Sequence, residues 1–429
     1  MWPFEYPYTN FHELNLDWII SRLKAIENYH PVNQEENKSY IIQINAVKED
    51  GTKTTAADIN KIIDEAENFS YIFLNGNFSI DETIVINHKN NFTIAGLGGC
   101  CFTATTLPVI KAIDSEKLNV RGITIKTSID PGAGSFDQNK YPFIASGNTF
   151  SNFSELRIIG RRYGFYMRGN INCSFEKMLF HVESQADIGD SATDAVSFTL
   201  GEGNVSSRFV KCASSYINKR GCGYFLYGNN TRDLIFDSCE TDNTRFGIFI
   251  DCTTSQYLNN IRFNNCLLDA IGFTAIRVKS NENGMPNIVF NSCYVWCNPA
   301  GANVADITGS GLNFENCEFH EGLIKADGTG NISFKGCRLF NCRTRLNSYK
   351  SLYMCGNTNS FTSEASGYLL NGVSGCIIGD SFKNESSAQM EWDINTNSGV
   401  AHSLYIAGVH SYGAFIHHYF TQAAATDVV

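Results

Sequence analysis

The most regular feature of the chain is a pairing of Phe and Cys that recurs through its middle. Six segments match Phe-x-x-Cys, with cysteines 27, 27, 27, 24 and 20 residues apart: Phe209/Cys212, Phe236/Cys239, Phe263/Cys266, Phe290/Cys293, Phe314/Cys317 and Phe334/Cys337. A repeat of this length cannot bury its own apolar residues, so it predicts a solenoid whose stacked coils share one core. Two earlier segments, Phe153/Leu156 and Phe175/Met178, keep the pattern with another apolar residue at the cysteine position, which places the first coils near residue 150 or earlier.

Alternation of apolar and polar residues within each repeat predicts short strands. The position five residues before each cysteine has the parity of the Phe, so both should point inward: Ser207, Leu234, Ile261, Ile288, Leu312 and Ile332. The two residues before the cysteine are turn formers, as in Asn264-Asn265, so the chain should bend there. Segments 223–228, 246–251 and 274–279 supply a further strand for their coils. The pattern therefore predicts an all-β fold, a parallel β-solenoid.

The apolar period changes before the solenoid, in residues 50–99. Residues 56–68 read as a helix with one apolar stripe made by Ile59, Ile62, Ile63 and Ala66, and strands are expected at 71–74 and 83–86. A helix at the open end of a solenoid would protect the first coil from edge pairing. We therefore expect this segment to be a small α/β cap.

The first thirty residues form a third kind of pattern. Leu16, Ile19, Leu23 and Ile26 follow the 3-4-3 spacing of a short coiled-coil seam, which is too short to hold a coiled coil alone. Two interpretations stay open. The segment is either an amphipathic helix packed on its own domain, or a docking or oligomerising helix tethered by the polar stretch 31–38.

Composition narrows the classes of partner. The chain has 33 basic and 43 acidic residues and a formal charge of -10, without a basic run that could neutralise a phosphate backbone, so nucleic acid is not an expected partner. No apolar run has membrane-spanning length, and the N-terminus lacks a secretory signal, so folding in a reducing cytoplasm is expected. The 15 cysteines are odd in number and recur at repeat positions, which favours reduced, buried thiols over disulfides.

Two segments carry a resemblance to known proteins. The stretch DGTKTTAADINKIIDEA…YIFLNGNFSIDETIVI…NFTIAGLGG and the coils of NIxFxxC type resemble pectate-lyase-like right-handed parallel β-helix proteins, particularly phage tail spikes, over roughly residues 50–345. The segment PYTNFHELNLDWII resembles the N-terminal virion-attachment segments of phages that infect Gram-positive bacteria. The resemblance implies a homotrimer fixed to a tail or capsid protein by its N-terminus. The motifs of polygalacturonases and pectate lyases are missing, so the resemblance does not by itself imply catalysis.

Together these patterns divide the chain into five expected parts. They are an attachment or oligomerisation helix in residues 1–30, a linker and first strand in 31–49, the cap in 50–127, the β-helix body in 128–345, and C-terminal coils with a trimer-contact region in 346–429.

The outward position three residues after each cysteine carries the strongest candidate chemistry. Down the coils it holds His181, Ser215, Asp242, Asp269, Trp296, His320 and Phe340. Stacked Asp242 and Asp269 would lie one strand spacing apart, where like-charge repulsion raises one pKa and lets the pair divide acid and base or nucleophile roles. Glu240 points the same way, Trp296 offers a flat face to a sugar ring, and His320 offers a donor. The alternative is that these are ordinary polar residues on a solvated surface.

A second acidic group lies in the longer interval between the coils of Met178 and Cys212. It comprises Glu183, Asp187, Asp190, Asp194 and Glu202. Extra length in one coil makes a loop over the lateral face, where substrate-binding residues collect. A solvated or calcium-binding loop is the competing interpretation, although the spacing is not that of an EF-hand.

Three further patterns resemble cofactor or metal motifs, but no cofactor and no metal are expected from them. Gly96-Leu97-Gly98-Gly99 lacks the Lys-Ser/Thr of a phosphate loop and reads as a turn. Cys100-Cys101 and Cys293/Cys297 lack partners at zinc spacing and are expected in the core. The C-terminal histidines fit a trimer contact better than a metal site: His402, His410, His417 and His418.

The sequence-based hypothesis is a virion protein synthesised in the bacterial host cytoplasm. It predicts a trimeric tail spike that binds and depolymerises a bacterial surface polysaccharide, as a hydrolase or a lyase. A receptor-binding or capsid-decorating fibre that holds glycan without cutting it is the alternative. A free cellular polysaccharide lyase or hydrolase is the third, and would carry a secretion signal.

Overall fold

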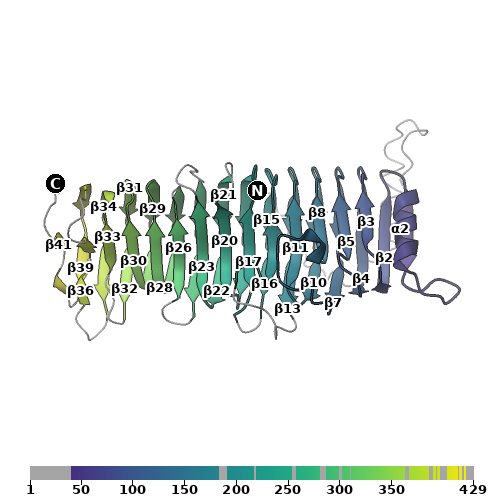
Figure 1. Ribbon diagram of the computed structural model, residues 1–429, viewed down its shortest axis with the longest axis horizontal. Coiled ribbons are helices and arrows are strands. Elements are labelled where there is room, and N and C mark those ends of the chain that lie inside the picture. The colour runs from purple at the N-terminus through teal and green to yellow at the C-terminus, as the bar shows by residue number, and fades with distance from the viewer. Residues whose placement is uncertain are drawn as a thin grey trace, which may run out of the picture.

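The computed structural model describes most of the chain from residue 40 onward. The described residues are 40–182, 191–216, 219–253, 258–280, 287–298, 302–309, 311–362, 367–385, 390–392, 394–396, 403–413, 415–417 and 420–421. The helix predicted in residues 1–30 lies outside them. Within this part the chain coils around one long axis, and each strand pairs in parallel with its equivalent in the next coil (Figure 1). The predicted parallel β-solenoid is confirmed.

Three strands make up a typical coil, and they form three lateral faces. Face A contains the strand that carries the Phe of the repeat. Its members are β6 (Asn119–Arg121), β9 (Asn152–Ser154), β12 (Ser174–Glu176), β15 (Arg208–Val210), β18 (Arg232–Asp237), β21 (Asn259–Asn264), β24 (Ile288–Asn291), β27 (Leu312–Glu315), β29 (Asn331–Lys335), β31 (Ser351–Cys355), β34 (Ser374–Ile378) and β38 (Ser403–Ala407).

Face B contains the strand that follows the cysteine. Its members are β7 (Thr124–Thr127), β10 (Arg157–Gly160), β13 (Leu179–Val182), β16 (Ala213–Ser215), β19 (Glu240–Asp242), β22 (Leu267–Ile271), β25 (Tyr294–Cys297), the first parts of β28 (Glu318–Asp327) and β30 (Arg338–Asn347), β32 (Thr358–Phe361), β35 (Ser381–Asn384) and β39 (His410–Tyr412).

Face C contains the third strand of each coil. Its members are β3 (Ile84–Asn87), β5 (Ile110–Ile113), β8 (Phe143–Ser146), β11 (Tyr163–Arg168), β14 (Val196–Leu200), β17 (Cys222–Tyr227), β20 (Phe246–Cys252), β23 (Thr274–Ser280), β26 (Asn303–Thr308), the second parts of β28 and β30, β33 (Tyr368–Asn371), β37 (Ile394–Thr396) and β41 (Phe420–Thr421).

The first and last coils complete the stack. β1 (Ile41–Asn45) pairs with β2 (Tyr71–Ile80), and β2 pairs with β4 (Thr93–Ala104), whose two ends pair with β6 and β7. The Gly-rich segment that was predicted to be a turn lies inside β4. Gly98 and Gly99 have positive φ there. Near the C-terminus, β36 (Met390–Trp392) pairs with β40 (Phe415–His417) in a separate small sheet.

Stacked aromatic rings fill the interior behind face A. The phenylalanines of the repeat are buried and lie ring over ring, with centroids 4.5 Å apart between Phe236 and Phe263 and 4.8 Å apart between Phe263 and Phe290. The ladder follows the whole predicted series: Phe153, Phe175, Phe209, Phe236, Phe263, Phe290, Phe314 and Phe334. One sequence position therefore becomes one continuous strip of core because consecutive coils are in register.

The cysteine of the repeat has a structural role that explains its recurrence. The Cys239 thiol donates to the carbonyl oxygen of Phe209 in the preceding coil, and Cys266 does the same to Phe236. The residue before the cysteine adopts a left-handed conformation, with φ of 53° at Asn265, which Asn tolerates better than most residues. All 15 cysteines are free, as expected, and most are buried. Cys101 is an exception to the expectation of core positions, because it faces outward on face B.

A helix covers the N-terminal end of the stack. α2 (Ala56–Glu65) begins with a capping box in which Thr55 accepts from the Asp58 amide and Asp58 accepts from the Thr55 amide. It buries Ile59 and Ile63 against the first coils and ends three residues before the predicted boundary. Figure 1 shows α2 at the N-terminal end of the stack, beside β2.

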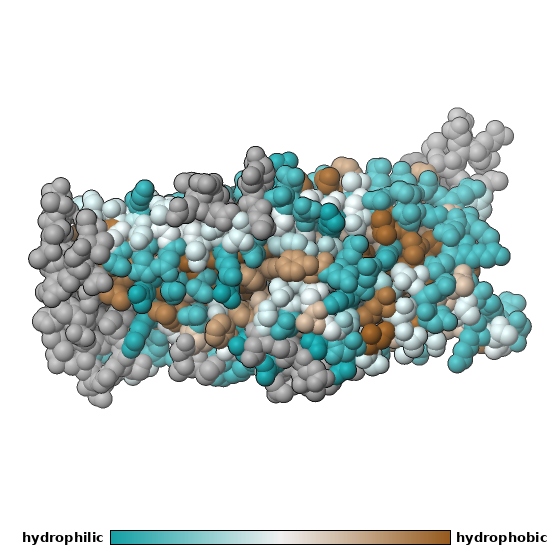
Figure 2. Space-filling model, in the orientation of Figure 1, coloured by the Kyte–Doolittle hydropathy of each residue, from teal (hydrophilic) through white to brown (hydrophobic). Residues whose placement is uncertain are grey.

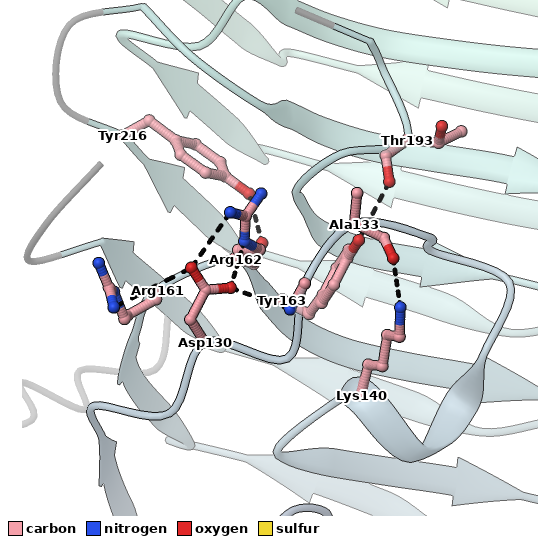
Figure 3. Close-up of polar contacts among 9 residues, drawn as sticks. Asp130, Ala133, Lys140, Arg161, Arg162, Tyr163, Thr193 and Tyr216 are labelled. Carbon is pink, nitrogen blue, oxygen red and sulfur yellow. Dashed lines mark hydrogen bonds and ion pairs between the residues drawn. The ribbon is translucent and has the colours of Figure 1, made fainter. Parts of the chain in front are cut away.

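A loop between β7 and β8 folds over face C and covers a cluster of tyrosines. It contains the short 3-10 helix η2 (Gln138–Lys140). Asp130 is held by the guanidinium of Arg162, a nearly buried side chain, and Tyr141 is buried beneath the loop with its hydroxyl 2.6 Å from Thr199 Oγ1. Figure 3 shows Asp130 with Arg162, and Lys140 donating to the carbonyl of Ala133 across the loop. The cluster gives face C a second apolar layer outside the main core.

Candidate functional site

Face B presents two columns of outward side chains. Residues of the first column come one residue after the repeat cysteine or its equivalent, and residues of the second column come three residues after it. Both columns point outward because side chains alternate along a strand. In the middle of the stack the first column runs through Ala213, Glu240, Leu267, Tyr294, Glu318 and Arg338. The second runs through His181, Ser215, Asp242 and Asp269, and continues from Trp296 to His320 and Phe340.

Asp242 and Asp269 are cross-strand partners. β19 and β22 pair in parallel with Asp242 opposite Asp269, so the two residues are separated by one strand spacing, about 4.8 Å. Both side chains are half-buried. Asn243 donates to both carboxylate oxygens of Asp242, at 2.9 and 3.0 Å. The arrangement places two carboxylates side by side and fixes the orientation of one of them.

Glu240 joins the pair from the first column. It precedes Asp242 by two residues, so both side chains leave the same side of β19. Desolvation by the surrounding protein raises the pKa of Glu240, and the charges of Asp242 and Asp269 raise it further. The raised pKa thus falls on Glu240, whereas the sequence pattern predicted a raised pKa for one of the aspartates.

The strand that carries Asp269 has a bulge. β22 and β25 are in register at Leu268 and Val295, and the register resumes at Ile271 and Cys297, so two residues on β22 oppose one on β25. The extra residue is Ala270, with φ of 51°. Trp296 therefore lies at the bulge beside Asp269, half-buried, and opposite His320 on its other side.

An aromatic strip continues from the bulge toward the C-terminus. The ring of His320 lies between Tyr294, 4.9 Å away, and Phe340, 4.7 Å away and stacked. Its Nε2 is 2.7 Å from Glu318 Oε1, and Arg338 Nη1 is 3.9 Å from the other oxygen of Glu318. Tyr294 and Glu318 were not among the predicted site residues. The signal was available, because both occupy the position one residue after a repeat cysteine, as Glu240 does.

The second predicted acidic group is not assembled with the first in the described residues. Glu183, Asp187 and Asp190 lie outside them. Asp194 accepts from the Ser191 amide and so closes its own turn before β14, and Glu202 is paired with Arg168 at 2.7 Å on the side of face C. Each has a local structural partner.

We searched the described residues for a metal-binding site. They contain no group of three or more His, Cys, Asp and Glu side chains that could hold an ion. Within the same residues, no helix has the length and apolar character needed to cross a lipid bilayer.

Comparison with solved structures identifies the fold. A mutant tailspike protein of E. coli bacteriophage HK620, in complex with a hexasaccharide, is 9% identical and matches over 88% of this chain and 78% of its own, with a TM-score of 0.52. The chain is a right-handed parallel β-helix, the fold of that tailspike. Tailspike protein 3 of bacteriophage CBA120 is 13% identical, with 92% of this chain and 60% of that chain covered and a TM-score of 0.47.

A bacterial enzyme module also matches the β-helix. The A-module of mannuronan C-5 epimerase AlgE6 of Azotobacter vinelandii is 12% identical, with 86% of this chain and 96% of the module covered and a TM-score of 0.46. No protein-family model and no curated protein sequence matches the chain. At these identities the likeness establishes the fold, and function has to be argued from the side chains.

Proposed function

We propose that the protein is a phage tail spike that binds and depolymerises a bacterial cell-surface polysaccharide on face B. The observation that carries this proposal is the triplet of Glu240, Asp242 and Asp269 beside an aromatic strip. Most glycosidases cleave with a pair of carboxyls that flank the scissile bond, and three carboxyls on adjacent positions of a rigid sheet supply such a pair. The tailspike with the same fold was solved with a hexasaccharide bound, which supports a glycan as the ligand.

Glu240 is the proposed general acid. Its raised pKa keeps more of the carboxyl protonated than usual near neutral pH, so it can donate a proton to the leaving glycosidic oxygen. Asp242 and Asp269 are proposed as the base or nucleophile and the stabiliser of positive charge on the sugar. Strand geometry places the Cα atoms of Glu240 and Asp242 about 6.6 Å apart along β19, and those of Asp242 and Asp269 about 4.8 Å apart across strands.

These separations bear on the stereochemistry of cleavage. Inverting glycosidases hold their carboxyls about 6.5–9.5 Å apart, to admit a water, and retaining ones about 5–5.5 Å. Those ranges refer to carboxyl groups, whereas the spacings above are between Cα atoms, so Glu240 with Asp242 and Asp242 with Asp269 are both candidate pairs. The anomeric form of the first product distinguishes the two pairs.

The aromatic strip is the proposed binding part of the site. Sugar rings pack their apolar faces on aromatic side chains, and Trp296, Tyr294 and Phe340 supply such faces within a few strands of the carboxylates. The pairing of His320 with Glu318 fixes that imidazole, which can then donate to a sugar hydroxyl. A glycan lying along the axis of the β-helix would contact the strip and the carboxylates together.

The assembly belongs to the same proposal. We place residues 1–30 as the segment that fixes a homotrimer to a tail or capsid protein, and 346–429 as the coils that contribute to trimer contacts. The β-helix would then project from the virion, with each copy of face B presented to the cell surface. Cross-linking and mass measurement of the purified chain, with and without residues 1–30, test the trimer and the role of that segment.

A glycan-binding fibre without cleavage is the second candidate. The hydrogen bonds from Asn243 occupy both oxygens of Asp242, which favours a structural role for that carboxylate over a free base. Incubation with host capsule or wall polysaccharide separates the candidates. New reducing ends or unsaturated products support a depolymerase, whereas retained binding with unchanged glycan length supports the fibre.

A further inference from the structure

A cavity on face B lies upstream of the carboxylates. It has a volume of about 520 Å³ and opens among the outward side chains of β4, β7 and β10. Lys126 and Arg157 line it together with Cys101, Thr103, Thr124 and Ile159. These residues occupy the same two columns as the candidate site, because Thr124 pairs with Arg157 and Lys126 with Ile159.

The cavity concentrates positive charge in an acidic protein. Lys126 and Arg157 are exposed diagonal neighbours, about 8 Å apart at their Cα atoms from strand spacing and rise. No acidic residue lines the cavity, and within the described part of the chain neither cation forms an ion pair or a side-chain hydrogen bond. By contrast, Arg208 on face A is paired with Asp237. Two uncompensated cations that converge on a hollow form a site for an anion.

The cavity and the candidate site are joined by a neutral path. Along the first column, Arg157 is followed by Leu179, Ala213 and Glu240, which is three strand spacings or about 14 Å. Along the second column the positions between hold His181 and Ser215. No carboxylate occupies these positions, so none of the side chains at them repels a negatively charged chain before it reaches Glu240.

We propose that this cavity is a subsite for the anionic group of an acidic glycan, a carboxylate or a phosphate, bound by Lys126 and Arg157. The inference rests on the proposed function and deepens it, since it assigns the polysaccharide to the acidic class. The cations hold the charged sugar, and the neutral path lets the same chain run along the axis to Glu240. The subsite then sets both the position of the chain and its preference over neutral glycans.

Cys101 supplies a reporter inside the cavity. It lies half-exposed among the lining residues, while Cys355 and Cys376, also half-exposed, belong to face A. Alkylation by iodoacetamide, which is neutral, followed by peptide mass spectrometry, measures all three thiols in one sample. A ligand in the cavity should slow the reaction at Cys101 and leave the other two unchanged.

The experiment compares three probes on the full chain carrying Asp242→Asn and Asp269→Asn, so that no probe is consumed. Oligogalacturonate carries carboxylates, glycerol-phosphate oligomers carry phosphates, and dextran oligosaccharides are neutral. We expect at least one anionic probe to slow Cys101 alkylation about tenfold, and dextran to have no effect. Which anion protects identifies the chemical source of the charge.

Two matched variants complete the test. Lys126→Gln with Arg157→Gln should raise the anion concentration needed for half protection about tenfold or more. Lys211→Gln with Arg262→Gln removes the same charge from exposed positions, one just after β15 and one on β21. This control should leave the anion concentration for half protection unchanged. Each variant is compared with and without probe, and its thermal unfolding is recorded to confirm folding.

The results separate this inference from the proposed function. Equal protection by dextran, no protection by either anion, or unchanged protection in the Lys126/Arg157 variant of a folded protein would overturn the subsite. Glycan cleavage by the wild-type chain is measured separately and does not depend on these outcomes. Protection without cleavage would keep the subsite and remove the enzymatic role.

Discussion

Asp242 and Asp269 stand opposite each other on adjacent coils of face B, one strand spacing apart. Neighbouring carboxylates on a rigid sheet repel each other, and in a protein with no other use for them the pair would cost stability. That cost is the physical reason to look for chemistry at this point of the surface.

The first prediction concerns this pair. Asp242→Asn and Asp269→Asn, made singly, should each lower the rate of glycan cleavage by about 10²-fold or more, because a general acid, base or nucleophile contributes about that much. Binding of the glycan, measured by titration calorimetry, should stay within about threefold. Asp64→Asn on the exposed side of α2 is the control and should retain full activity. Unchanged cleavage in both aspartate variants would remove this column from the mechanism.

The second prediction concerns the pKa of Glu240. The charges of Asp242 and Asp269 contribute to raising it, after desolvation, so neutralising either one should lower it. Isotope-edited infrared titration of the Glu carboxylates, with Glu240→Gln to assign the band, measures the change. In the wild-type protein, cleavage that depends on protonated Glu240 should decline as pH rises through this pKa. A pKa that does not move in either Asn variant would show that the three carboxyls are not coupled.

The third prediction concerns the Phe ladder. Phe263→Ala removes a buried ring stacked on Phe236 and Phe290, so it should lower the free energy of unfolding by about 3–5 kcal/mol. Phe136→Ala removes a ring that is 60% exposed on the loop over face C, and should cost less than half as much. Urea denaturation followed by circular dichroism compares the two. Equal losses would mean that the interior stack does not carry the stability of the coils.

The fourth prediction concerns a carboxyl buried in the C-terminal coils. Asp380 is fully buried, accepts from the Asn357 amide and the Tyr368 hydroxyl, and has its pKa raised by desolvation. A raised pKa favours the protonated form in the folded state. Its contribution to stability is therefore complete below the unfolded-state pKa, near 3.9, and is lost as pH rises through the folded-state pKa.

The variant Asp380→Asn tests that sign. It should lack this loss, so the stability difference between variant and wild type should shift in favour of the variant between acid and neutral pH. Glu385→Gln is the control with the opposite sign, because the ion pair with Lys383 and the bond from Ser360 lower the pKa of Glu385. Thermal unfolding across this range measures both, and parallel curves for wild type and Asp380→Asn would contradict the prediction.

The sequence predicted the fold well because one position repeats one environment. Phe263 and Cys266 recur at fixed offsets, and every copy meets the same neighbours in the next coil, so a pattern along the chain becomes a line in space. The helix at residues 56–65 was visible for a different reason, since its apolar stripe and capping residues are local. Neither inference needed knowledge of distant contacts.

The site was predicted less completely because it depends on details between coils. The bulge at Ala270 shifts the strand that carries Trp296, and no spacing in the sequence reveals it. Cys101 was expected in the core from its residue type, whereas the parity of β4 turns it outward beside Lys126. The coils that carry Lys126 and Arg157 lack the repeat cysteine, so the sequence does not show that these two residues share the outward columns of the candidate site.

The helix across the first coil has a consequence for how the protein is made. α2 buries Ile59 and Ile63 at the N-terminal end of the core, and β1 is the outermost described strand of face A, so each later coil has its template in the coil before it. Synthesis delivers the chain in the same order. We therefore expect the stack to grow from its N-terminal end during synthesis, with each new coil pairing with the coil made before it, so that only the strands of the last coil are unpaired at any time.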